Sequence, residues 1–228
     1  MLALLLSLPA AATTTAAAQS DLSGRWVLEL SVVISAKIPV FGQTELVTKT
    51  TMLANISDGI QHHTTCTVNP TSPLRMVVTT VPDSFIRHIK DKSYPITVGA
   101  DGSYRADFGP QYIAYDPTIS GGDPPADPDH PAVFDWDDDG NPGATILLDA
   151  PLFGRSEVYI TQLAHTRLIG QVTSPDTITG GLNIVSMRQR SIGAKPSMFS
   201  ANPKATQIPE QSTFTYTPIP AGSTCESL

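Results

Sequence analysis

The chain has 228 residues, which is enough for one all-β domain or two small ones. Its formal net charge is −7 at pH 7, and the stretch from Ala106 to Gly154 holds ten Asp with no Glu, Lys or Arg. Nucleic acids select proteins with the opposite charge, so this local acidity argues against a nucleic-acid partner.

The chain begins with a pattern that is typical of a signal peptide. Residues 1–18 are an apolar core followed by small residues, and Ala16 and Ala18 mark a cleavage site before Gln19. The apolar run is too short and too interrupted for a transmembrane segment. We therefore expect a secreted or periplasmic bacterial protein whose mature form begins near Gln19.

Hydrophobic and polar residues alternate along several short stretches, which indicates β-strands. Trp26, Leu28 and Leu30 share one face of the first stretch, and Ser57-Asp58-Gly59 predicts a hairpin turn between residues 44–56 and 60–68. A short helix is expected over residues 85–90. Further strands are expected over residues 74–81, 94–98, 103–108, 144–148, 157–163, 167–173 and 178–187, with a hairpin turn at 164–166.

These elements predict an all-β domain over residues 19–193, with about eight to ten antiparallel strands. A Pro-, Gly- and Asp-rich stretch over residues 116–143 reads as one long acidic loop, and residues 194–228 as an extended C-terminal tail. A sandwich and a closed up-and-down barrel both fit. The barrel is favoured, because hairpins join sequence neighbours and closure removes exposed edges.

The chain has two cysteines, Cys66 and Cys225. In an exported protein the default for such a pair is a disulfide, with two free thiols as the alternative. The bridge would hold the C-terminal tail against the first half of the chain. The chain-entropy model gives such a long loop a stabilisation of about 4 kcal/mol.

The acidic loop ends in a pattern that indicates cation binding. Carboxylates occur at Asp135, Asp137 and Asp139, followed by Gly140 and Asn141. Ca²⁺ takes six to eight oxygen ligands, and a loop supplies them from alternate residues before a turn at glycine. The backbone carbonyl of Asn141 would add a further ligand. The alternative is a solvated acidic loop that keeps the protein soluble.

This spacing resembles the Asp-x-Asp-x-Asp-Gly start of an EF-hand calcium loop. The resemblance ends at the twelfth position, where Ile146 stands in place of the bidentate Glu, and no helix is indicated on either side. The loop is therefore more similar to the freestanding Asp-rich calcium loops of secreted bacterial proteins. Asp149 or Asp129 could provide the missing ligand, and the Ca²⁺ would be structural.

The start of the first strand, Leu22-Ser23-Gly24-Arg25-Trp26, resembles the Gly-x-Trp signature of lipocalins and related calycin barrels. In that family the Trp closes the barrel floor beneath an Arg that follows the last strand. The resemblance implies the same structural role for Gly24 and Trp26, with Arg188 or Arg190 as the cation–π partner. It also implies a barrel that holds a small hydrophobic ligand, unless its own side chains fill it.

The sequence leaves several functions open, and it does not indicate an oligomeric state. The first is a non-catalytic barrel that binds a small apolar ligand or an envelope partner. The second is a hydrolase or isomerase that uses His62 or His63 with an Asp at the barrel mouth. Neighbours on a strand point to opposite faces, so the two histidines are not expected to bind one metal ion together. The third is an adhesion or structural envelope module.

Overall fold

The computed structural model describes residues 21–38, 42–71, 77–150, 154–200, 202 and 205–228. The signal peptide expected over residues 1–18 lies outside the described residues, as does part of the strand expected from residue 74. The strands are β1 (Gly24–Ile38), β2 (Gly42–Ser57), β3 (Ile60–Thr71), β4 (Val78–Thr80), β5 (Lys92–Val98), β6 (Ser103–Ile113), β7 (Ala144–Ala150), β8 (Gly154–Ser174), β9 (Thr177–Lys195), β10 (Ala205–Gln207) and β11 (Thr213–Pro218). The short helices are α1 (Asp83–Arg87), α2 (Pro117–Ser120), η1 (Ser197–Phe199), η2 (Pro209–Gln211) and η3 (Cys225–Ser227).

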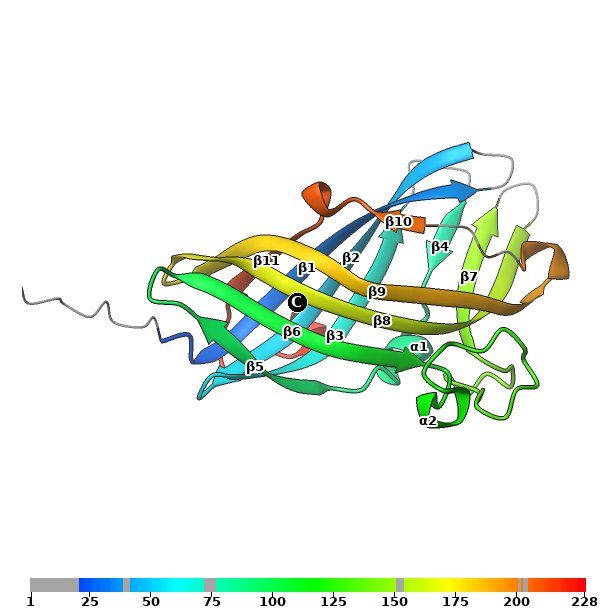
Figure 1. Cartoon of the computed structure of the whole chain (residues 1–228), viewed down its shortest axis with the longest axis horizontal. Helices are drawn as coiled ribbons and strands as arrows, with labels where there is room; N and C mark the ends of the chain where they lie inside the picture. The colour runs from blue at the N-terminus through cyan, green and yellow to red at the C-terminus, as the bar shows by residue number, and fades with distance from the viewer. Residues whose placement is uncertain (1–20, 39–41, 72–76, 151–153, 201, 203–204) are drawn as a thin grey trace, which may run out of the picture.

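Eight strands form a closed, barrel-like ring (Figure 1). Around the ring the order is β1, β2, β3, β5, β6, β8, β9 and β11, and β11 pairs back onto β1. This is also the chain order, and every pairing is antiparallel. The all-β, up-and-down arrangement that the sequence predicts is therefore confirmed.

The ring carries an extension on one edge of β8. Residues 162–171 of β8 pair with β6, whereas residues 154–160 pair with β7, which in turn pairs with β4. The chain between β6 and β7 is the long acidic loop, which lies beside this extension in Figure 1. The loop therefore joins the ring to the added strands.

The hairpin turn predicted at residues 164–166 was wrong, because β8 continues through it. Ala164 and His165 pair with β6 on one side and with β9 on the other. His165 and Arg167 both contact the Asp107 carboxylate, at 2.5 and 2.6 Å.

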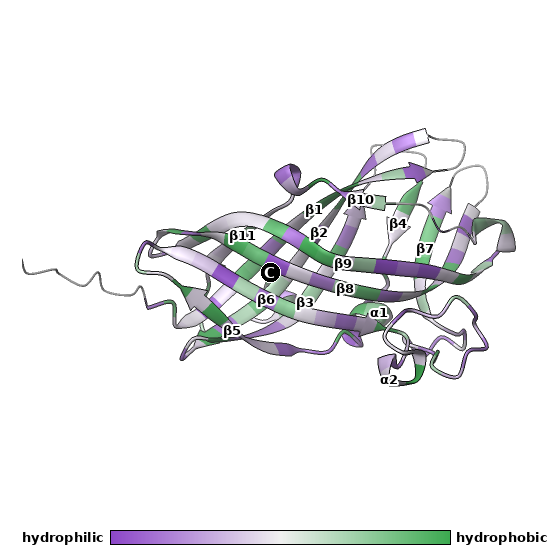
Figure 2. Cartoon of the chain, in the orientation of Figure 1, coloured by the Kyte–Doolittle hydropathy of each residue, from purple (hydrophilic) through white to green (hydrophobic). Residues whose placement is uncertain are grey.

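The interior of the ring is filled by side chains from its own strands. Period-two alternation places every second residue of β1 inward, beginning with Trp26, Leu28 and Leu30, which are all buried. Figure 2 shows the resulting alternation of hydrophobic and hydrophilic residues along the strands. The other buried members of this core are Leu22, Met52, Ala54, Ile56, Tyr94, Tyr104, Ala106, Leu168, Ile178, Leu182, Phe214 and Tyr216.

A polar network crosses this interior and centres on Gln61, which is 0 % exposed. Its Oε1 accepts hydrogen bonds from the hydroxyls of Tyr104 and Tyr216, at 3.1 and 2.9 Å, and its Nε2 donates to the Tyr94 hydroxyl at 2.8 Å. The Tyr94 oxygen also lies 2.7 Å from Nδ1 of His63. Because Tyr94 already accepts from Gln61, its single proton is free to go to His63, which fits a neutral imidazole.

A second buried cluster lies under α1, the acidic loop and the β7–β8 extension. Its members are Phe85, Ile113, Ala114, Trp136, Ala144, Val158 and Ile160. Trp136 belongs to the acidic loop, and its Nε1 donates to the Phe85 carbonyl at 3.0 Å. The acidic loop is therefore anchored to a core of its own.

The disulfide predicted between Cys66 and Cys225 is confirmed, with Cα atoms 5.2 Å apart. The expected C-terminal tail pairs with the edge of β1: β10 lies antiparallel to residues 34–36, and the Ile208 amide donates to the Val33 carbonyl. It also supplies β11, which completes the ring between β1 and β9. Sequence reasoning did not anticipate this strand. The described residues include no helix that is long and apolar enough to cross a membrane.

Burial of His63 predicts a specific loss of stability in acid. Burial, aided by the charge of Lys92, lowers the pKa of this imidazole to about 4. Between that value and the unfolded pKa of about 6.5, the unfolded chain binds more protons, so the free energy of unfolding falls as the pH falls. We expect His63 to account for about 2 to 3 kcal/mol of the loss between pH 7.5 and 4.5. Urea unfolding of His63→Gln should show a smaller acid loss than the wild type, whereas the exposed control His62→Gln should match the wild type.

The disulfide closes a loop between residues 159 positions apart, so its removal should destabilise the folded state. We expect Cys66→Ser/Cys225→Ser to lose about 4 to 5 kcal/mol in the free energy of unfolding, because the unfolded chain gains freedom. Chemical denaturation measures this loss. Dithiothreitol should lower the stability of the wild type and leave the double variant unchanged, and an effect of the reductant on the double variant would contradict this account.

Candidate metal site

The three aspartates that the sequence singled out converge at the end of the acidic loop. Asp135, Asp137 and Asp139 each offer a carboxylate oxygen, and these oxygens all lie within 4.8 Å of one another. Burial increases toward the centre: Asp139 is exposed, Asp135 is half-buried and Asp137 is only 4 % exposed. The arrangement is that of a group that could hold a metal ion.

Backbone pairing fixes the two ends of this loop. The Trp136 amide donates to the Gly143 carbonyl at 2.9 Å, and the Gly143 amide donates to the Phe134 carbonyl at 3.1 Å. Between these bonds the chain bends at Gly140, whose φ is +85°. A left-handed backbone of this kind favours glycine, as the sequence pattern anticipated.

Two carboxylates of the triad organise the loop. Oδ1 and Oδ2 of Asp135 accept hydrogen bonds from the amides of Asp139 and Gly140, at 3.2 and 2.8 Å. Oδ1 of Asp139 accepts from the Asn141 amide at 2.8 Å, and its Oδ2 accepts from the Thr145 hydroxyl at 2.5 Å. These bonds hold the side chains in place and offset part of their mutual repulsion.

The third carboxylate is held differently. Oδ2 of Asp137 accepts from the Thr145 amide at 3.1 Å, but its Oδ1 is buried and has no hydrogen-bond partner. Burial raises the pKa of this carboxyl, and the negative charges of Asp139 and Asp135 add to the rise. A buried oxygen without a partner is costly in a folded protein. A cation bound by the triad would satisfy this oxygen and neutralise the repulsion.

The remaining predicted ligands lie in different positions. Asn141 is at the loop, where its side-chain oxygen accepts from Nζ of Lys195 at 2.7 Å, so its carbonyl as a ligand stays a prediction. Asp149 lies opposite Arg155 in the register of β7 and β8. Neither Asp149 nor Asp129 belongs to the cluster of Asp135, Asp137 and Asp139. Sequence reasoning missed Thr145, which lies at the start of β7 and contacts two of the three carboxylates.

The lipocalin-like contact is different from the one predicted. Trp26 is buried, its Nε1 donates to the Leu22 carbonyl at 3.0 Å, and its ring packs edge-on against Tyr216. Arg188 is exposed and forms an ion pair with Asp123 of the acidic loop, so it is not the partner of Trp26. The long loop between β6 and β7 places Asp123 beside β9, where its carboxylate pairs with Arg188.

His62 and His63 point to opposite faces of β3, as predicted. His63 is in the interior network, whereas His62 is exposed and its Nδ1 lies 2.5 Å from Oγ of Ser93. The His–Asp pairs of the described residues are elsewhere, between His88 and Asp138 and between His165 and Asp107. Among the described residues, neither His62 nor His63 forms the predicted hydrogen-bonded pair with an Asp.

Comparisons with protein-family models, curated proteins and solved structures found no match. The likenesses to lipocalins and to EF-hand loops therefore remain resemblances of short motifs.

Gly143 should be the glycine of the loop that is hardest to replace. Its φ is +92°, and an added Cβ would lie 2.8 Å from Cδ1 of Ile192 and 3.0 Å from the Ile160 carbonyl. We expect Gly143→Ala to lose about 2 to 5 kcal/mol in the free energy of unfolding, from backbone strain and overpacking together. Gly140→Ala is the matched control: its φ is also positive but open space surrounds it, so we expect about 1 to 2 kcal/mol. Equal losses in chemical denaturation would contradict the steric argument.

Proposed function

We propose that this protein is an exported, non-catalytic β-barrel module that carries a structural Ca²⁺ in the loop of Asp135, Asp137 and Asp139. The observation that carries the metal proposal is the buried, unpartnered Oδ1 of Asp137 beside two further carboxylates. Ca²⁺ suits the site because it accepts oxygen ligands in irregular loop geometry, whereas Mg²⁺ demands a near-ideal octahedron. The donor set contains only oxygens, which also disfavours the softer transition metals.

The ion would have a structural role in this module. Trp136 stands between two of the aspartates and is packed in the second core beside Phe85. Neutralising the triad would therefore stabilise the loop together with the cluster beneath it. The triad has no histidine or serine nucleophile among its hydrogen-bond partners in the described chain, which supports a staple rather than a reaction centre.

The filled interior supports a function on the outer face. Gln61, Tyr104 and Tyr216 occupy the middle of the ring and satisfy one another's hydrogen bonds. Eight strands enclose a space that side chains alone are able to fill. Between the two binding functions that the sequence left open, this packing favours an envelope partner over a small apolar ligand. The disulfide agrees with an oxidising compartment outside the cytoplasm.

Thermal unfolding tests the calcium proposal, because a ligand of the folded state raises the melting temperature. With free Ca²⁺ at a hundredfold excess over its dissociation constant, we expect a rise of about 5 to 10 °C relative to EGTA. The same concentration of Mg²⁺ should give a smaller rise. Absence of any calcium-dependent rise in the wild type would remove the metal from the proposal.

The effect of Asp137→Asn on the melting temperature should depend on whether calcium is present. In EGTA we expect it to melt no lower than the wild type, because the substitution removes a buried, unpaired charge. In Ca²⁺ it should melt well below the wild type, because one ligand charge is gone. The matched control is Asp138→Asn, which changes the exposed carboxylate between the last two ligands and should keep the full calcium response. A variant that is destabilised equally in both conditions would indicate a purely structural carboxylate.

A further inference from the structure

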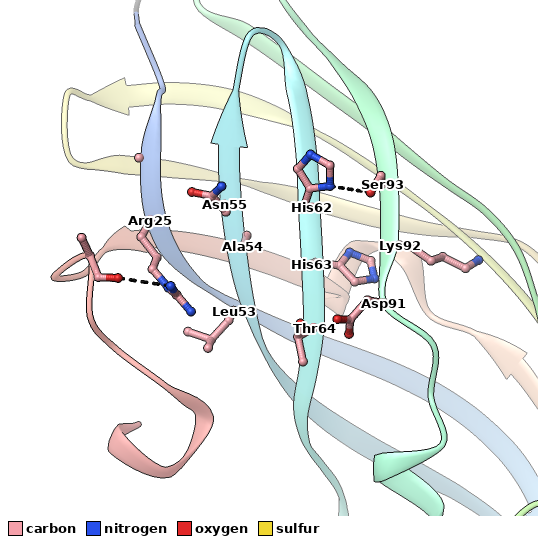
Figure 3. Close-up of a pocket in the computed structure, with 12 residues that line it drawn as sticks. Arg25, Leu53, Ala54, Asn55, His62, His63, Thr64, Asp91, Lys92 and Ser93 are labelled. Carbon is pink, nitrogen blue, oxygen red and sulfur yellow. Dashed lines mark hydrogen bonds between the residues drawn. The ribbon is translucent and has the colours of Figure 1, made fainter.

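A groove of about 390 Å³ with a mixed polar and apolar lining lies on the outside of the ring, across β1, β2, β3 and the start of β5 (Figure 3). Ala54 and His63 are buried on the inner side, so their chain neighbours Asn55 and His62 face outward. The C-terminal tail borders the groove at Ala221, which accepts a hydrogen bond from Nη1 of Arg25 at 3.1 Å. The groove contains no residue of the acidic loop.

One row of polar side chains crosses the groove. Arg25 pairs with Asn55, Asn55 with His62, and His62 with Ser93, so the four residues are successive cross-strand neighbours on one face. At about 4.8 Å between strands, the backbone positions at the two ends of this row are about 14 Å apart. The row offers a guanidinium, an amide, an imidazole and a hydroxyl to anything that lies along it.

The two ends of the groove carry opposite charges that the described residues leave unpaired. The Arg25 guanidinium forms no ion pair there, and its Nε is buried without a hydrogen-bond partner. Asp91, which precedes Ser93 by two residues and lies beside the far end of the row, borders the opposite side and also forms no ion pair in the described chain. The neighbouring Lys92 does not compensate it, because its Nζ donates to the carbonyls of Phe108 and Pro110, at 3.2 and 2.7 Å.

We propose that this groove binds a short zwitterionic peptide, with the peptide carboxylate at Arg25 and the peptide ammonium at Asp91. In Figure 3 these two side chains lie on either side of Leu53 and Thr64. An extended chain spans at most about 3.3 to 3.6 Å per residue, so about four residues cover a backbone separation of about 14 Å. The side chains of Arg25 and Asp91 extend from their backbones into the groove, so a peptide of two or three residues is long enough to reach both. Asn55 has both a donor and an acceptor for the peptide amides.

The charge pattern sets this ligand apart from simpler ones. A polyanion would be repelled by Asp91 and a cation by Arg25, so repulsion at one end would offset the attraction at the other. A ligand with both charges at its ends satisfies each without leaving a charge unpaired. The inference rests on the proposed function that the ring binds through its outer face, and it names the chemistry of that binding.

The test is calorimetric titration of the full mature chain with trialanine and with its two blocked forms. N-acetyl-trialanine lacks the ammonium, and trialanine amide lacks the carboxylate. We expect millimolar or tighter binding of trialanine and a weakening of about tenfold or more for each blocked peptide, because each loses a charge-assisted contact. No saturable binding of trialanine, or equal binding of all three peptides, would overturn the proposal without any need for a variant.

Two variants then assign the ends of the groove. Arg25→Gln should bind trialanine and its amide equally, and Asp91→Asn should bind trialanine and its N-acetyl form equally. The matched controls Arg105→Gln and Asp176→Asn change exposed charges outside the groove and should keep the wild-type pattern. Far-UV circular dichroism verifies that each variant is folded. If Arg25→Gln still bound trialanine more tightly than the amide, Arg25 would not be the carboxylate site. If Asp91→Asn still bound trialanine more tightly than the N-acetyl form, Asp91 would not be the ammonium site.

The calcium proposal and the groove proposal fail separately. Trialanine binding should be the same in EGTA and in Ca²⁺, because the groove and the triad share no residue. Loss of the calcium effect on melting would leave peptide binding intact. Loss of peptide binding would overturn the groove and leave the calcium effect intact.

Discussion

The buried side chain of Gln61 is the constraint on which the rest of this fold depends. An amide with no access to water must find its hydrogen bonds inside the protein, and here tyrosines from β5, β6 and β11 provide them. Gln61 of β3 and the β5–β6 hairpin lie far along the chain from β11, so the network joins the C-terminal strand to the first half of the ring. A half-satisfied network would cost more than an apolar core, and this one is joined at every member. The interior is consequently a packed centre.

Because the centre is packed, the surfaces that face a partner are the outer face of the ring and the loops. The strands that close the ring leave a polar row at Arg25, Asn55, His62 and Ser93, and the tail forms one border of it. The disulfide between β3 and η3 holds that tail in place. Closing the ring through β11 and shaping the groove are therefore two consequences of one C-terminal segment. The segment also contributes to the core, because Phe214 and Tyr216 of β11 are buried inside the ring.

The sequence predicted the parts of this structure that depend on local pattern. Alternation along β1 identified Trp26, Leu28 and Leu30 as interior, and the Asp spacing located the triad. Sequence patterns failed to predict the features that depend on contacts between distant parts of the chain. Ala164–Thr166 has a polar composition that suits a turn, yet two neighbouring strands hold it extended. The family likeness predicts Arg188 or Arg190 as the partner of Trp26, but Arg188 forms an ion pair with Asp123 of the acidic loop. Thr145 as a partner of the carboxylates depends on how β7 leaves the loop, which no spacing encodes.

The two cores of the protein are stabilised by different means. The ring core is closed by strand pairing, its internal network and a covalent bridge, none of which depends on a dissolved ion. The second core includes Trp136, whose neighbours in the chain are two carboxylates of the triad, so its packing is tied to the charge state of that loop. Like charges held this close weaken the segment that carries them unless a cation offsets the repulsion. Local stability in proteins varies with such features. A cation at the triad would therefore act mainly on the β7–β8 extension and leave the ring, together with its outer groove, unchanged.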